Sequence, residues 1–81
     1  MLYEDMVIDE IVNFYRANNL DFDITISFQY LFNTTGLSND ALDEILRSFN
    51  DNGFLKDVCW ADYIAFEFYL SKLGQKKFGL I

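Results

Sequence analysis

Apolar residues in the first part of the chain recur at helical spacing. In residues 4–18, EDMVIDEIVNFYRAN, they stand three and four residues apart, and Glu4 and Asp5 lie where a helix dipole favours negative charge. This spacing predicts a first helix that ends at Asn18 and Asn19. The next residues, LDFDIT, alternate apolar and polar side chains, which predicts a short strand with one buried face. The residues on that face are Leu20, Phe22 and Ile24.

Two further helices are predicted close together, each with a serine at its start and a glycine at its end. Ser27 and Gly36 bound the segment SFQYLFNTTG, and Ser38 and Gly53 bound SNDALDEILRSFNDNG. The second of these segments carries apolar residues at the i, i+3, i+4 and i+7 positions of one helix face. These residues are Leu42, Ile45, Leu46 and Phe49.

From Phe54 onward the hydrophobic repeat shortens to that of a strand. The segments FLKDVCW and IAFEFYL flank ADY, which predicts a hairpin whose tip lies near Ala61 and Asp62. After the hairpin, Ser71 begins a last helical turn, KLGQKKF. A chain of 81 residues suffices for one hydrophobic core, so residues 1–81 are expected to form a single domain. The second strand is expected to bury Ile64, Phe66, Phe68 and Leu70.

The predicted order, three helices followed by a two- or three-stranded β wing, resembles the winged helix-turn-helix fold of the α+β class. In LSNDALDEILRSFNDNGFLK, a capped helix leads through a glycine into a strand. The residues that carry this likeness are Ser38, Leu42, Leu46, Phe49, Gly53, Phe54 and Leu55. FYLSKLGQKKF resembles the end of the wing in repressors of the multiple-antibiotic-resistance (MarR-like) and phenolic-acid (PadR-like) types. Its matching residues are Phe68, Leu70, Ser71, Gly74 and Phe78.

The resemblance implies which side of the third helix meets a partner. In the family, the exposed side of this helix enters the major groove of DNA, and the wing contacts phosphates or the minor groove. The corresponding positions here carry four carboxylates, one arginine and two asparagines. They are Asn39, Asp40, Asp43, Glu44, Arg47, Asn50 and Asp51. The candidate phosphate contacts are Lys56, Lys72, Lys76 and Lys77.

Charge argues against DNA as the partner. The net charge is −7, and residues 1–55 hold most of the acidic side chains. Because phosphate binding depends on lysine and arginine, we expect a small regulatory or inhibitory module that binds a basic or nucleic-acid-binding protein, and DNA is the less favoured partner. A DNA-binding transcriptional regulator that uses the third helix and the wing is the alternative. Carboxylates along a helix can present charge as phosphates do, and small phage and mobile-element proteins often have this DNA-mimicking character. A merely solvated acidic face is the simpler alternative.

The residues needed for several kinds of chemistry are missing. The chain has no histidine and one cysteine, so zinc sites and histidine-based catalytic triads are excluded, and no glycine-rich phosphate loop occurs. We therefore expect a protein that is not an enzyme and has no cofactor, no metal and no catalytic residue. Cys59 is expected to be a partly buried thiol in the hairpin.

Aromatic residues are numerous, and most of them fall on the faces predicted to be buried. The rings expected in the core are Phe22, Phe28, Phe32, Phe49, Phe66 and Phe68, whereas Tyr3, Tyr30, Trp60 and Tyr63 have weaker core assignments and would mark a contact surface if exposed. A homodimer through the first helix or through Phe78, Leu80 and Ile81 is an alternative. With one cysteine and no long apolar run, we expect a cytoplasmic protein that does not bind membranes.

Overall fold

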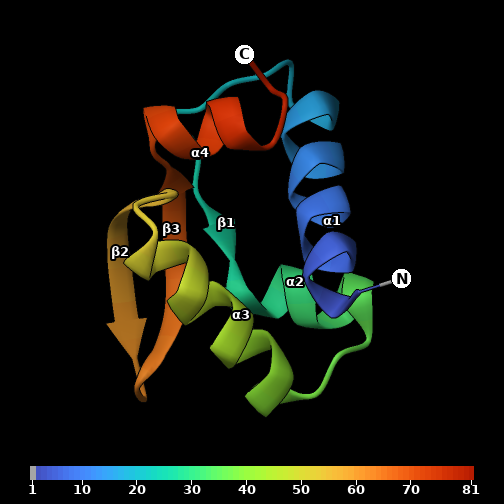
Figure 1. The fold of residues 1–81 in the computed structure, drawn as a ribbon, viewed down its shortest axis with the longest axis vertical. Coiled ribbons are helices and arrows are strands. Elements are labelled where there is room, and N and C mark those ends of the chain that lie inside the picture. Colours follow the sequence, from blue (N-terminus) through green and yellow to red (C-terminus); the bar gives the residue numbers. More distant parts are fainter. Residues whose placement is uncertain (1) are drawn as a thin grey trace.

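The computed structural model describes residues 2–81, which form four helices and one small sheet (Figure 1). The helices are α1 (Tyr3–Ala17), α2 (Phe28–Thr35), α3 (Asn39–Asp51) and α4 (Lys72–Lys77). The strands are β1 (Ile26–Ser27), β2 (Leu55–Ala61) and β3 (Ile64–Leu70), which pair antiparallel in the order β1–β3–β2. The fold is α+β, as predicted, and its topology is consistent with a winged-helix-like architecture.

The helices begin and end at the residues that the sequence indicated. Each of three serines precedes a helix and accepts a hydrogen bond from a backbone N–H of its first turn, at 3.0, 3.2 and 3.0 Å. These serines are Ser27, Ser38 and Ser71. At the end of α2, Gly36 has a left-handed φ of 71°, a conformation that glycine adopts without a steric penalty. Gly53, which follows α3, has a φ of 77°.

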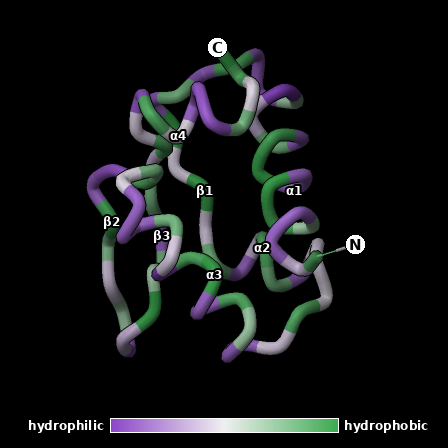
Figure 2. Tube along the Cα trace, in the orientation of Figure 1, coloured by the Kyte–Doolittle hydropathy of each residue, from purple (hydrophilic) through white to green (hydrophobic). Residues whose placement is uncertain are grey.

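The core lies between the helices and the inner face of the sheet. Along α1 and α3, hydrophobic and hydrophilic residues alternate at helical spacing (Figure 2). Each helix therefore has a buried side, formed by Val7, Ile11 and Tyr15 in α1 and by Leu42, Leu46 and Phe49 in α3. Of the phenylalanines expected in the core, Phe28, Phe49 and Phe68 are buried, whereas Phe22 and Phe32 are half-buried.

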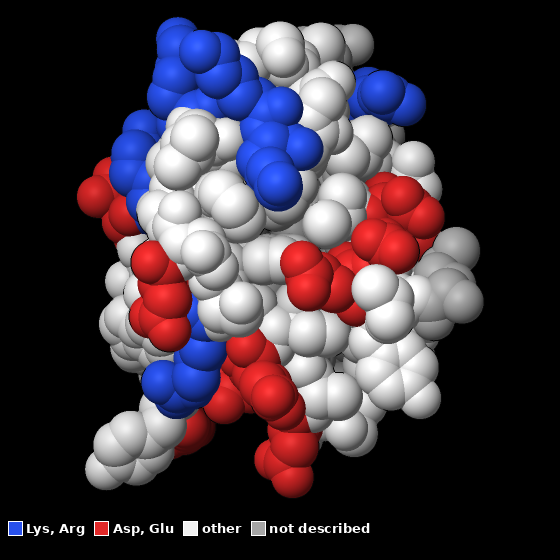
Figure 3. Space-filling model, in the orientation of Figure 1, with Lys and Arg blue, Asp and Glu red and all other residues white. Residues whose placement is uncertain are grey.

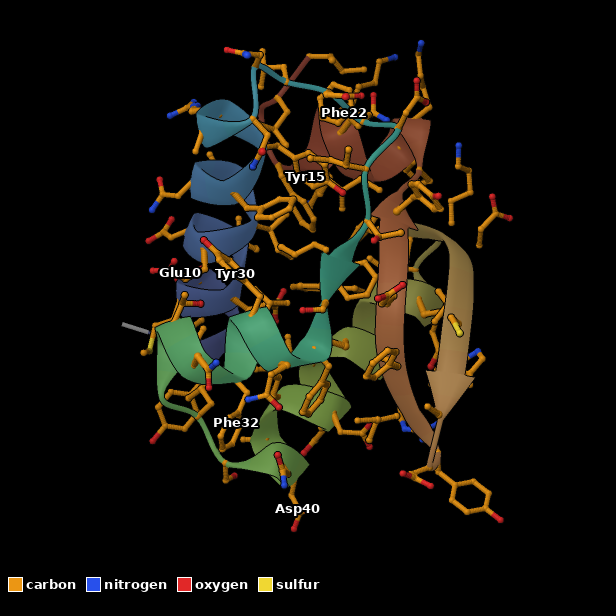
Figure 4. All side chains as sticks on the ribbon, turned by 180° about the vertical axis from the view of Figure 1, so that it is seen from behind. Glu10, Tyr15, Phe22, Tyr30, Phe32 and Asp40 are labelled. Atoms are coloured by element: carbon orange, nitrogen blue, oxygen red, sulfur yellow. The ribbon has the colours of Figure 1, made fainter. Side chains whose placement is uncertain are left out.

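Tyr15 joins α1 to the segment that leads into the sheet. Its ring lies 5.1 Å from that of Phe14 and 5.3 Å from that of Phe22, measured between centroids (Figure 4). Its hydroxyl donates a hydrogen bond to the Ile24 carbonyl at 3.1 Å. Burial raises the pKa of Tyr15 to about 12, so this donor keeps its proton at any physiological pH.

The prediction of a strand over LDFDIT was wrong. Asn19 and Leu20 have positive φ angles of 59° and 57°, so the chain turns sharply after α1, and the side chain of Leu20 is exposed. Only Ile26 and Ser27 pair with the sheet, opposite Phe68 and Glu67 of β3. The partner of β1 thus lies some forty residues along the chain, and local alternation does not reveal so distant a pairing.

The hairpin forms as predicted, but the alternation of buried and exposed residues along its strands is interrupted. The β2–β3 register shifts on both sides of Cys59, between Lys56 and Trp60, as in a sheet that contains bulges. Such a shift turns neighbouring side chains to opposite faces. Ala65 is consequently buried and Phe66 is 43% exposed, so the prediction of a buried Phe66 was wrong. Cys59 is exposed, which also corrects the expectation of a partly buried thiol.

Gly74 allows α4 to pack against the start of β2. A Cβ atom at this position would lie 2.1 Å from the carbonyl oxygen of Phe54, although the Gly74 backbone needs no unusual φ. The contact is reinforced by Ser71, whose hydroxyl donates to the Gly53 carbonyl at 2.5 Å. The serine and glycine of the predicted wing end therefore serve packing.

Replacing Gly74 should test this close approach. We expect Gly74→Ala to lower the free energy of unfolding by about 3 kcal/mol, because the new methyl group overlaps backbone that cannot easily move. Gly36→Ala is the control: its φ is positive but no atom lies within 4 Å of the added Cβ, so a loss of about 1 kcal/mol is expected. Urea unfolding followed by circular dichroism measures both variants. Equal losses would show that Gly74 is not a close contact.

Candidate functional site

The predicted partner-binding residues all lie on α3 and on the side away from the core. Burial of Leu42, Leu46 and Phe49 fixes the rotation of this helix about its axis. Asp43 and Asn50 are half-buried. The other five are exposed: Asn39, Asp40, Glu44, Arg47 and Asp51. Asp40 points away from the body of the molecule at the start of α3 (Figure 4). The structure thus brings the predicted set together as one surface.

Arg47 connects this surface of α3 to the hairpin. Its Nε donates to Oδ2 of Asp43 at 2.9 Å, one helical turn away. Its Nη2 donates to the backbone carbonyl of Tyr63 at the tip of the hairpin. The guanidinium group also lies over the Trp60 ring, 5.1 Å from the centroid, within the range of a cation–π interaction. Arg47 is therefore bound on two sides by its own protein.

This arrangement determines which charges α3 presents. Arg47 is the only basic residue between Asn39 and Asp51, and its charge is paired with that of Asp43. The exposed charges that remain are the carboxylates of Asp40, Glu44 and Asp51. The outward side of α3 is therefore negative, and a polyanion would be repelled from it.

The tip of the hairpin presents aromatic side chains beside α3. Tyr63 is 89% exposed, and Trp60 and Phe66 are each nearly half exposed. Asp62 and Tyr63 form the turn with φ angles of 50° and 66°, a left-handed conformation that aspartate tolerates but that is costly for tyrosine. The bond from Arg47 helps to hold this turn. Tyrosine and tryptophan are enriched where protein interfaces gain most of their affinity, so the tip extends the surface of α3.

Three of the four candidate phosphate-binding lysines lie at the far end of the molecule from the hairpin tip. Lys72, Lys76 and Lys77 are on α4, at the end of the molecule opposite the hairpin tip (Figure 1). Figure 3 shows most of the basic side chains of that face gathered over the α4 end, a separate basic group lower down, and acidic side chains spread over the rest of the face. Lys56, on β2, lies 5.6 Å from the centroid of the Tyr69 ring. Arg47 and the lysines therefore do not form one basic strip on this face.

A hollow of about 360 Å³, which sequence reasoning missed, borders the acidic surface. One wall is the start of α1, with Leu2, Tyr3 and Glu4. The other wall is α3, with Ala41, Glu44, Ile45 and Ser48. The spacing of these four α3 residues is itself i, i+3, i+4 and i+7, which is a signal of a second helix stripe. The contact of α3 with α1, however, depends on tertiary structure.

Comparisons with protein-family models, with curated proteins and with solved structures find no match for the chain. Within residues 2–81, no group of three or more histidine, cysteine, aspartate or glutamate side chains is placed to hold a metal ion. None of the helices in the described part of the chain has both the length and the apolar character of a membrane span.

The contact of Arg47 with the hairpin can be measured through Trp60, the only tryptophan. We expect Arg47→Gln to make Trp60 more accessible to iodide quenching and to lower the free energy of unfolding by about 1 kcal/mol, because it removes the ion pair and the stacked guanidinium. The matched control is Arg16→Gln in the last turn of α1, which should leave Trp60 quenching unchanged. Identical quenching in wild type and Arg47→Gln would contradict the bridge.

Proposed function

We propose that this chain is a small regulatory or inhibitory module that binds a basic protein without catalysing a reaction. The binding surface comprises the exposed side of α3 and the hairpin tip. The single observation that carries the proposal is the contact of Arg47 with Asp43 and the hairpin, which leaves Asp40, Glu44 and Asp51 as the exposed charges of α3.

The surface has the chemistry that a basic partner requires. Exposed carboxylates can pair with lysine and arginine, and such complementary charges guide association and exclude other partners. Beside them, the rings of Tyr63 and Trp60 can receive apolar contacts or a further cation. A surface of carboxylates and aromatic rings therefore supplies both electrostatic attraction and anchoring contacts.

The most specific form of this proposal is competition with nucleic acid. A winged-helix-like domain that presents carboxylates where related folds present basic residues offers a protein's DNA-binding groove a substitute for phosphate. Such a DNA-mimicking inhibitor would act in the cytoplasm on a nucleic-acid-binding protein, and its small acidic chain suits a phage or mobile-element origin.

Two other functions have less support. A DNA-binding regulator would have to rely on the α4 lysines, because Arg47 is already bound by Asp43 and the hairpin. Self-association through the chain end would use mainly Ile81, since Phe78 and Leu80 are buried in the core. Neither arrangement uses the acidic side of α3.

Charge reversal should separate a specific acidic surface from a general effect of net charge. The assay is displacement of a fluorescent DNA duplex from a panel of basic DNA-binding proteins, measured by anisotropy. We expect the wild type to displace DNA from at least one of them, and Asp40→Lys/Glu44→Lys to be at least about tenfold weaker, because two facing ion pairs are lost.

The control is Asp9→Lys/Asp23→Lys, which makes the same change in net charge at two exposed positions outside α3. It should retain displacement within about threefold, because neither position belongs to the proposed binding surface. Equal loss in the two double variants, or no displacement by the wild type, would refute the proposed function.

A further inference from the structure

The hollow between α1 and α3 has apolar walls that stand open to solvent. Leu2 is 71% exposed and Tyr3 is 61% exposed, and they face the stripe of α3 that contains Ile45. A small molecule is usually enclosed over most of its surface, whereas these side chains leave the hollow open. Its openness therefore suits the surface of another protein better than an isolated small ligand.

The α3 wall has the form of a helix-packing surface. Ala41 and Ser48 are small residues that stand one turn on either side of the longer Glu44 and Ile45. A ridge of side chains from another helix packs into grooves of this kind, as in helix-in-groove recognition. The α1 wall supplies the second side, so an incoming helix would lie between the two helices of this chain.

Charge identifies the kind of helix that would fit. Each wall carries one glutamate, Glu4 on α1 and Glu44 on α3. Asp40, also exposed, lies one turn before Glu44 on the same helix. A helix with one apolar face would bury that face against Ile45 and Tyr3. Lysine or arginine residues along the edges of the same helix would pair with these carboxylates.

We propose that the hollow binds an amphipathic, basic helix of the partner protein. This inference rests on the proposed function, of which it names the docking position and the partner's recognition element. The apolar side chains of the partner helix enter the hollow, while its basic side chains contact Glu4 and Glu44. The acidic side of α3 then continues the same interface toward the hairpin.

A synthetic peptide tests this docking position directly. The probe is an amphipathic helical peptide of about 18 residues, with leucine along one face and lysine elsewhere, and its controls are a scrambled sequence and a version with glutamate for lysine. Binding is measured by fluorescence anisotropy and mapped by NMR amide shifts. We expect the probe to bind at least about tenfold more tightly than either control, with the largest shifts at the α3 wall of the hollow.

Two substitutions at exposed positions should weaken binding without disturbing the core. Tyr3→Ser removes part of an apolar wall, and Ser48→Tyr fills the hollow, so each should raise the dissociation constant about fivefold or more. Glu4→Gln/Glu44→Gln should weaken binding and reduce its dependence on salt. Circular dichroism checks that each variant remains folded.

These experiments distinguish two results: that no helix docks in the hollow, and that the chain does not bind a basic protein at all. Equal binding of probe and scrambled peptide, or no effect of both Tyr3→Ser and Ser48→Tyr, would overturn docking in the hollow. If Asp40→Lys/Glu44→Lys still abolished DNA displacement, the acidic surface of α3 would remain supported as the binding site. Absence of probe binding would likewise overturn this inference, whereas failure of the displacement assay would remove the function on which it rests.

Discussion

Burial of one side of α3 is the constraint on which the rest of the molecule depends. Leu42, Leu46 and Phe49 are 0%, 0% and 1% exposed, and they contribute to the single core that a chain of this size can form. Once these residues face inward, helical geometry fixes the direction in which every other side chain of α3 points. One flank of α3 meets the hairpin through Arg47, the other borders the hollow with Ile45, and the carboxylates between them face solvent.

Arg47 has a small effect on stability and a large effect on the charge of the surface. An exposed ion pair and a cation–π contact each contribute about 1 kcal/mol or less, so the fold does not require them. These contacts matter because they hold Arg47, the only basic residue of α3, against Asp43 and the hairpin. The same contact steadies a turn in which Tyr63 has a left-handed backbone.

Local sequence patterns predicted the helices and the hairpin because their determinants are local. Serine caps, terminal glycines and helical spacing are all contained within a few residues. The errors occurred where distant contacts decide: β1 pairs with a strand far along the chain, and the register shifts near Cys59 reverse the burial expected for Phe66. The acidic residues of α3 share one helix, so helical spacing alone places them near one another. The contact between Arg47 and the hairpin, and the hollow beside α1, arise only in the folded chain.

The residues that suggested a winged-helix resemblance build the structure and do not form the proposed binding surface. Ser38 and Ser71 cap helices, Gly74 permits a close contact, and Phe68 and Phe78 are buried. Such a resemblance therefore bears on architecture, while function must be inferred from the exposed residues. In this chain the exposed side of α3 carries mainly carboxylates, whereas phosphate binding depends on lysine and arginine.

The central claim is that the negative side of α3 does not bind DNA. Its most direct test is titration of duplex DNA with the wild-type protein at about 50 mM salt, where phosphate contacts are strongest. We predict no binding to any duplex sequence, because the exposed charges of α3 other than Arg47 are negative and Arg47 is held by Asp43 and the hairpin. Tight, sequence-selective binding to duplex DNA that persists at physiological salt would contradict the claim.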